Sequence, residues 1–181
     1  MPTTTVQIST ELITTEPLTT TKITTRPPPQ IICSINNCSL ILSSSTGNGK
    51  LNSNLINTDT ILNKDSSSIS CLELDIFSGF VNLLTISLKS NLITCIYSYQ
   101  FSGLVNIEKI DLSYNSISTS IIDQFEGLIN LQSLNLYNNQ IPSISESSFN
   151  NLSSLRRLDL YNNLITTPIT NHFLGLTNLQ S

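Results

Sequence analysis

The sequence predicts an α/β solenoid, in which short repeats stack their strands into one parallel sheet. Three observations predict it. A period of 24 residues runs from Leu83 to Asn178, apolar and polar residues alternate at the start of each copy, and one asparagine recurs at the same place in every copy. A fixed period of about 20 to 50 residues is typical of stacked repeats, which bury apolar surface between neighbours and need no central core.

Each copy repeats the same pattern of apolar residues, asparagine and phenylalanine. The copies read Leu83, Ile86, Leu88, Asn91, Ile93, Phe101 and Leu104; Ile107, Ile110, Leu112, Asn115, Ile117, Phe125 and Leu128; Leu131, Leu134, Leu136, Asn139, Ile141, Phe149 and Leu152; and Leu155, Leu158, Leu160, Asn163, Ile165, Phe173 and Leu176. This L-x-x-L-x-L-x-x-N-x-L spacing resembles the leucine-rich-repeat family, and its 24-residue extracellular type, found in secreted matrix proteins, axon-guidance ligands and Toll-like receptor ectodomains. The resemblance implies a right-handed β-α superhelix, with a curved parallel sheet on the concave side and short helical or irregular returns on the convex side.

Positions are numbered here from the first residue of each copy, so that Leu83 is position 1. Strand periodicity places positions 4 and 6 inward and positions 3, 5 and 7 outward. The asparagine at position 9 is expected to bond turn backbone of its own coil and of the neighbouring coil. These ladder asparagines are Asn91, Asn115, Asn139 and Asn163. Asn138, by contrast, is expected to face outward and to tolerate alanine.

The chain divides into three segments. Residues 1–30 are rich in threonine and end in prolines, which predicts a disordered tail or an O-glycosylated stalk. Residues 31–58 are expected to form an N-terminal cap. Residues 59–181 form the array, with one degenerate repeat, four full repeats and the start of a fifth. Because solenoids need capped ends and the fifth repeat is cut short, we expect the chain to be a fragment of a longer protein.

Composition argues against two classes of partner. The formal net charge is −4 and only 11% of residues are charged, so no basic stripe is available for nucleic acid. No apolar run approaches the roughly 20 residues of a membrane span. The N-terminus also lacks the apolar segment of a secretory signal. We therefore expect neither a nucleic-acid partner nor a membrane span within this stretch.

The four cysteines, Cys33, Cys38, Cys71 and Cys95, allow three disulfide pairings. Cys71 and Cys95 are one period apart, and stacking at about 4.8 Å suits the Cα separation that a disulfide needs. This predicts an inter-coil disulfide and leaves Cys33 with Cys38, near a cap where extracellular members of the family commonly carry a tighter cysteine cluster. A four-thiol zinc site is the alternative, but the paired C-x₂-C spacings that it requires are absent, and no metal is expected.

The sequence argues against catalysis. The only histidine, His172, is expected at the surface of a return, and the chain has neither a G-x-S-x-G nucleophile motif nor a phosphate loop. Asp111 and Asp159 lie two coils apart, about 10 Å by strand spacing. That separation would suit an inverting glycosidase pair, but without a pocket we expect solvated carboxylates. The expectation is a protein with no catalytic residue and no cofactor.

The resemblance implies that ligands bind at the outward strand positions of the concave face. The candidate residues are Lys109, Asp111, Tyr114, Asn135, Tyr137, Arg156, Arg157, Asp159 and Tyr161. Tyrosine and arginine are enriched at binding hot spots, and Tyr137 and Tyr161 share position 7, so their rings are expected to stack. The alternative is a solvated strand face whose tyrosines pack for sheet stability.

The predicted function is non-catalytic recognition of a protein partner, in a secreted or cell-surface protein. Two glycosylation sequons, at Asn37 and Asn151, would be used only in the secretory route. Asn151 lies between the inward residues Phe149 and Leu152, so we expect it to face solvent. The alternative function is that of a structural adhesive or matrix element with a glycosylated stalk.

Overall fold

The computed structural model describes residues 60–72, 76–166, 171–173 and 175–180. This part covers most of the predicted array. The predicted tail at 1–30 and the predicted cap at 31–58 lie outside the described residues, as do Cys33, Cys38 and Asn37.

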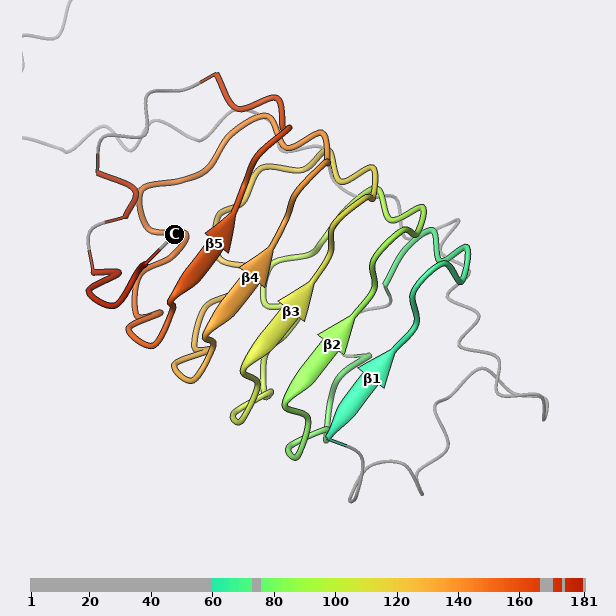
Figure 1. Ribbon diagram of the computed structural model, residues 1–181, viewed down its shortest axis with the longest axis horizontal. Coiled ribbons are helices and arrows are strands. Elements are labelled where there is room, and N and C mark those ends of the chain that lie inside the picture. Colours follow the sequence, from blue (N-terminus) through green and yellow to red (C-terminus); the bar gives the residue numbers. More distant parts are fainter. Residues whose placement is uncertain (1–59, 73–75, 167–170, 174, 181) are drawn as a thin grey trace, which may run out of the picture.

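Five short strands form one parallel sheet, in the order of the chain (Figure 1). They are β1 (Ile61–Asn63), β2 (Thr85–Ser87), β3 (Lys109–Asp111), β4 (Ser133–Asn135) and β5 (Arg157–Asp159). Each strand pairs with the strand one period later, so that Leu62, Ile86, Ile110, Leu134 and Leu158 lie in register. Across the described residues the returns are turns and irregular segments without a helix, so the helical form of return is not seen there.

A left-handed residue ends each strand segment. Position 8 has a positive φ of 52° to 58° in every coil, at Ser66, Ser90, Tyr114, Asn138 and Asn162. L-residues adopt this conformation at a cost, which asparagine and glycine tolerate best. The turn directs the next residue, the asparagine of position 9, toward the inside of the coil.

The returns contain a second left-handed position, 21. Glycine occupies it as Gly103, Gly127 and Gly175, with φ of 82° to 100°, and Asn151 occupies it in the remaining full repeat with φ of 69°. No atom lies within 4 Å of a Cβ added at these three glycines, so the backbone angle alone favours glycine there. Asn151 therefore replaces a glycine in a turn that asparagine can adopt.

The core is a continuous apolar column between the sheet and the returns. The inward residues Ile86, Ile110 and Leu134 are buried, and the phenylalanines stack from coil to coil. The ring centroids of Phe77 and Phe101 are 5.3 Å apart, those of Phe101 and Phe125 5.5 Å, and those of Phe149 and Phe173 6.1 Å. In the last coil, by contrast, Leu158, Leu160 and Ile165 are only partly buried.

Candidate ligand-binding face

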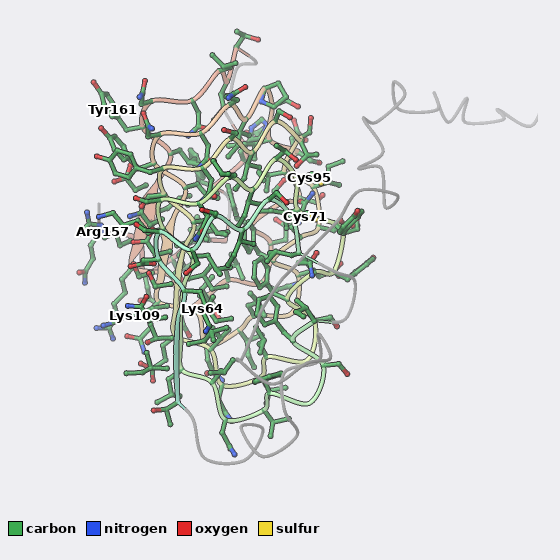
Figure 2. All side chains as sticks on the ribbon, turned by 90° about the vertical axis from the view of Figure 1, so that its right-hand side faces the viewer. Lys64, Cys71, Cys95, Lys109, Arg157 and Tyr161 are labelled. Carbon is green, nitrogen blue, oxygen red and sulfur yellow. The ribbon has the colours of Figure 1, made fainter. Side chains whose placement is uncertain are left out.

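The register brings the candidate binding residues onto one surface, which we call the sheet face: positions 2, 3, 5, 7 and 8 of each coil. Lys109 and Arg157 flank Ser133 in one row, and Asp111 and Asp159 flank Asn135 in the next. Figure 2 shows Lys109, Arg157 and Tyr161 projecting from the sheet, with Cys71 and Cys95 on the opposite side of the coils. The array thus has a polar sheet face and a separate return side.

An aromatic row crosses the sheet face. The rings of Tyr137 and Tyr161 are stacked, with centroids 5.8 Å apart and planes 5° apart, as the shared position predicts. Tyr114 meets Tyr137 edge-on at 5.0 Å, and the Lys89 ammonium lies 5.5 Å from the centroid of Tyr114. A hydrogen bond with Tyr114 raises the pKa of the Tyr137 phenol. Four coils therefore contribute to one tyrosine row that begins with a cation–π contact.

The tyrosine row is accessible at its last member. Tyr161 is 76% exposed and Tyr114 is 45% exposed, whereas Tyr137 is half-buried between them. Tyr114 also carries the left-handed backbone of position 8. Serine or asparagine has the same backbone in the other coils, so this conformation belongs to the fold and is no special feature of the tyrosine.

The carboxylates at position 5 have a structural role that the sequence interpretation missed. The side-chain oxygens of Asp111, Asn135 and Asp159 each accept a hydrogen bond from the backbone N–H two residues later, at 2.9, 3.0 and 3.1 Å. Asp111 also accepts from the Asn135 amide at 3.3 Å. Asp111 and Asp159 remain partly exposed, but they are more than solvated carboxylates, because both stabilise the turn after their strand. The recurring aspartate or asparagine at position 5 was the sequence feature from which this role could have been predicted.

The cations on the sheet face have few internal partners. Lys109, Arg156 and Arg157 are all exposed. The described residues contain one ion pair, between the Arg157 guanidinium and Asp159 at 3.9 Å, and the Arg157 side chain is 65% exposed. An exposed pair at that distance contributes little. These side chains are therefore free to bind groups in solution.

The position 9 asparagines bond two coils at once. Asn139 accepts a hydrogen bond from the Ile117 N–H at 3.0 Å and donates to the carbonyls of Leu112 and Leu136 at 3.0 and 3.1 Å. The corresponding bonds are present at Asn91, Asn115 and Asn163. Asn91, Asn115 and Asn139 are buried, whereas Asn163 is half-buried in the last coil.

Two further polar ladders were not predicted. At position 24, Asn106 and Asn130 donate to the carbonyls of Val81 and Val105, at 2.9 and 2.8 Å. At position 18, buried polar side chains contact a carbonyl of the preceding coil, as Ser148 does with Ile121 at 2.5 Å. Recurring polar residues just before the leucine of position 1 and before the phenylalanine were the signals for these ladders.

The position 18 ladder corrects the prediction for His172. This histidine is 6% exposed, and its Nε2 lies 2.9 Å from the carbonyl oxygen of Ile144. The surface placement was wrong because position 18 is buried in each of the four full repeats, where a polar side chain can bond the coil before it. His172 thus has a structural contact on the return side, away from the sheet face.

The described residues offer neither a metal site nor a membrane-spanning helix. They contain no group of three or more histidine, cysteine or acidic side chains that could hold a metal. None of their segments forms a helix with the length and apolarity to span a bilayer. Cys71 and Cys95 are buried and disulfide-bonded, and their pairing with each other stays a prediction.

The comparisons agree with this architecture. Residues 60–117 and 129–181 match the family described as leucine rich repeat. The chain therefore belongs to the leucine-rich-repeat family. A search of curated proteins found no significant match.

Two similar solved structures are complexes of several proteins. One is the Toll–Spätzle complex of Drosophila, with 28% identity and a TM-score of 0.52 over 62% of this chain and 15% of the matched chain. The other is the octameric complex of Latrophilin 3, Unc5D and FLRT2, the last contributing its leucine-rich repeats, with 27% identity and a TM-score of 0.56 over 66% and 37%. This chain thus spans well under two thirds of either matched chain.

Proposed function

We propose that this chain is a non-catalytic recognition module that binds a protein partner on its sheet face. The tyrosine row is the observation that carries the proposal. Tyr114, Tyr137 and Tyr161 contact one another in sequence across adjacent coils. Side chains held by such contacts lose little conformational freedom on binding, which is the advantage of aromatic residues in preorganised binding surfaces.

The surroundings of the row suit a protein interface. Arg156 and Arg157 lie on the same coil as Tyr161, and both are exposed. Tyrosine and arginine are the residue types most often found at interface hot spots. By their descriptions, one similar structure holds Toll in complex with Spätzle, and the other holds the leucine-rich repeats of FLRT2 in complex with Latrophilin 3 and Unc5D. These likenesses support a protein as the ligand without identifying it.

The proposed location is extracellular or at the cell surface. Disulfide-bonded Cys71 and Cys95 favour an oxidising compartment. The sequon at Asn151 lies at an exposed position, where a glycan could be attached. Both features belong to the return side, so they leave the sheet face open.

A photo-crosslinking experiment tests the proposal. A photoreactive residue is placed at Tyr161 on the sheet face or, as the matched control, at Glu126 on the return side; both side chains are exposed. The protein is added to cells, and the cross-linked partner is identified and purified. We expect saturable cross-linking from Tyr161 only.

Alanine variants then measure the contribution of the face. Tyr161→Ala and Arg157→Ala should each weaken binding of the purified partner by about 2 kcal/mol, while Glu126→Ala and Glu146→Ala should not change it. An equal loss from the Glu variants would place the interface on the return side. Failure to find any saturable partner would favour the structural adhesive or matrix element instead.

A further inference from the structure

Among the described residues, the basic side chains lie on the strand side of the array and none lies in a return. Every basic residue among the described positions lies in a strand or within two residues of one: Lys64, Lys89, Lys109, Arg156 and Arg157. Four of them occupy sheet-face positions, whereas Lys64 is half-buried at the inward position 6. The charged residues of the described returns are all acidic, namely Asp123, Glu126 and Glu146. The cations of this acidic chain are thus concentrated on the side that carries the tyrosine row.

The carboxylates of the sheet face are largely occupied by internal bonds. Asp65 accepts hydrogen bonds from the Ser87 hydroxyl at 2.6 Å and from the Lys89 N–H at 2.9 Å. Asp111 accepts from Ser113 and Asn135, and Asp159 accepts from the N–H of Tyr161. Few of these carboxylate oxygens are therefore left to accept hydrogen bonds from a ligand.

The cations differ from the carboxylates in this respect. The side chains of Lys109 and Arg156 have no hydrogen-bond or ion-pair partner within the described part of the chain, and Arg157 has only the 3.9 Å contact with Asp159. Lys109 and Arg157 lie in one register row, two strand spacings apart through Ser133, which is roughly 10 Å. The sheet face therefore presents unpaired donors, with few free acceptors to match them.

We propose that the partner of the sheet face contributes an acidic segment, in which two carboxylates pair with Lys109 and with Arg156 and Arg157 while apolar groups contact the tyrosine row. This inference rests on the proposed function. In a polyproline II segment, residues three apart lie on the same side of the chain and about 9 Å apart, so acidic residues at that spacing match the roughly 10 Å between Lys109 and Arg157. Guanidinium groups bind carboxylates through paired, charge-assisted hydrogen bonds.

A uniform polyanion fits this face less well. Glu108 precedes Lys109 on the same strand segment, and its side chain makes no hydrogen bond or ion pair with the described residues. It would therefore repel an evenly charged phosphate or sulfate chain. Nucleic-acid and heparin-type ligands require a longer stripe of basic groups. A protein segment, by contrast, can carry carboxylates where it meets the cations and neutral residues where it meets Glu108.

The first experiment uses a synthetic extended peptide with two glutamates three residues apart and one phenylalanine. A peptide with glutamine in place of both glutamates is the control. We expect the acidic peptide to shift the amide NMR signals of β3, β4 and β5, and to bind at least tenfold more tightly than the control. Equal binding of the two peptides, or tighter binding of a sulfated oligosaccharide of equal charge, would overturn the inference.

Substitutions of the basic residues show which of them bind the acidic peptide. Arg157→Gln and Lys109→Gln should each weaken the acidic peptide severalfold and reduce the salt dependence of its binding. Lys64→Gln, on the first coil, should leave the affinity unchanged. One outcome is that the partner cross-links at Tyr161 while its affinity is unchanged by Arg157→Gln and by added salt. In that case the proposal of an acidic segment is wrong and the proposed function of the sheet face stands. If cross-linking occurs from Glu126 alone, the proposed function itself fails.

Discussion

Positions 8 and 9 of each coil show how adjacent asparagines can have different physical roles. Asn138 has a φ of 54° and contacts the Asn162 amide through its side-chain oxygen, whereas Asn139 is buried and bonds two coils. The expectation that Asn138 tolerates alanine is therefore revised. Alanine at a left-handed position costs about 1 kcal/mol, which outward placement alone does not reveal.

Replacing Asn139 by alanine should lower the free energy of unfolding by about 1 to 3 kcal/mol, because the Ile117 N–H and the Leu112 carbonyl lose their buried partner. Urea unfolding measures the change. Asn138→Gly is the matched control, since glycine adopts the same backbone angle without strain. A loss of the same size in both variants would contradict a stabilising role for the ladder.

At the scale of the element, each return is held by contacts with the coil before it. The inward residue shifts from position 14, as in Ile96 and Ile144, to position 15 at Ile121, which is buried and bridges to Ile144. The returns can therefore vary locally while the strands keep their register. Two predictions concern these returns.

Cys71 and Cys95, both at position 13, should form one inter-coil disulfide in secreted protein. Non-reducing peptide mapping should recover the two cysteines in a single linked fragment. Because the bond would join the first two described coils, Cys71→Ser with Cys95→Ser should destabilise the protein by about 2 to 4 kcal/mol. Recovery of Cys71 or Cys95 linked to Cys33 or Cys38 would show that the pairing is wrong.

Asn151 should carry a glycan when the protein is made with a signal peptide. The residue is exposed in a left-handed turn that asparagine tolerates. Mass spectrometry of secreted protein measures its occupancy. Ser153→Ala is the better variant for removing the site, because it abolishes the sequon and leaves the backbone preference of Asn151 intact.

The glycan also tests the choice of face. If the partner binds the sheet face, Ser153→Ala should leave its affinity unchanged. An unmodified Asn151 in folded, secreted protein would count against glycosylation at this turn, and a loss of affinity in Ser153→Ala would argue for binding on the return side.

At the scale of the whole molecule, stability should depend on the place of a coil in the stack. In a repeat array each coil contacts only its neighbours. Leu134 in β4 has a coil on either side and is fully buried, whereas its register partner Leu158 in β5 is only partly buried. The same residue type thus occupies the same position in two different surroundings.

Leu134→Ala should cost about 2 to 5 kcal/mol of stability, as cavity formation in a packed core does, and Leu158→Ala should cost clearly less. Urea unfolding of the two variants gives the comparison, and hydrogen exchange should show β5 opening before β3. Equal losses would mean that the last described coil is packed as tightly as the centre.

Much of the fold could be predicted because its information is local and repeated. The period determines which strands pair, and alternation determines that Ile110 and Leu134 face inward while Lys109 and Arg157 face outward. The shared position of Tyr137 and Tyr161 was enough to predict their stack, since parallel strands in register place equal positions side by side.

The sequence by itself thus determined the solenoid, the strand register and the residues that can lie on the sheet face. Only the tertiary structure decided which of those residues are free to bind. Asp111 accepts a hydrogen bond from the Asn135 amide, and His172 lies buried against Ile144, because the donors and acceptors of one coil are satisfied partly by the next. Such contacts join residues about one period apart in sequence, so a single copy of the repeat does not reveal them.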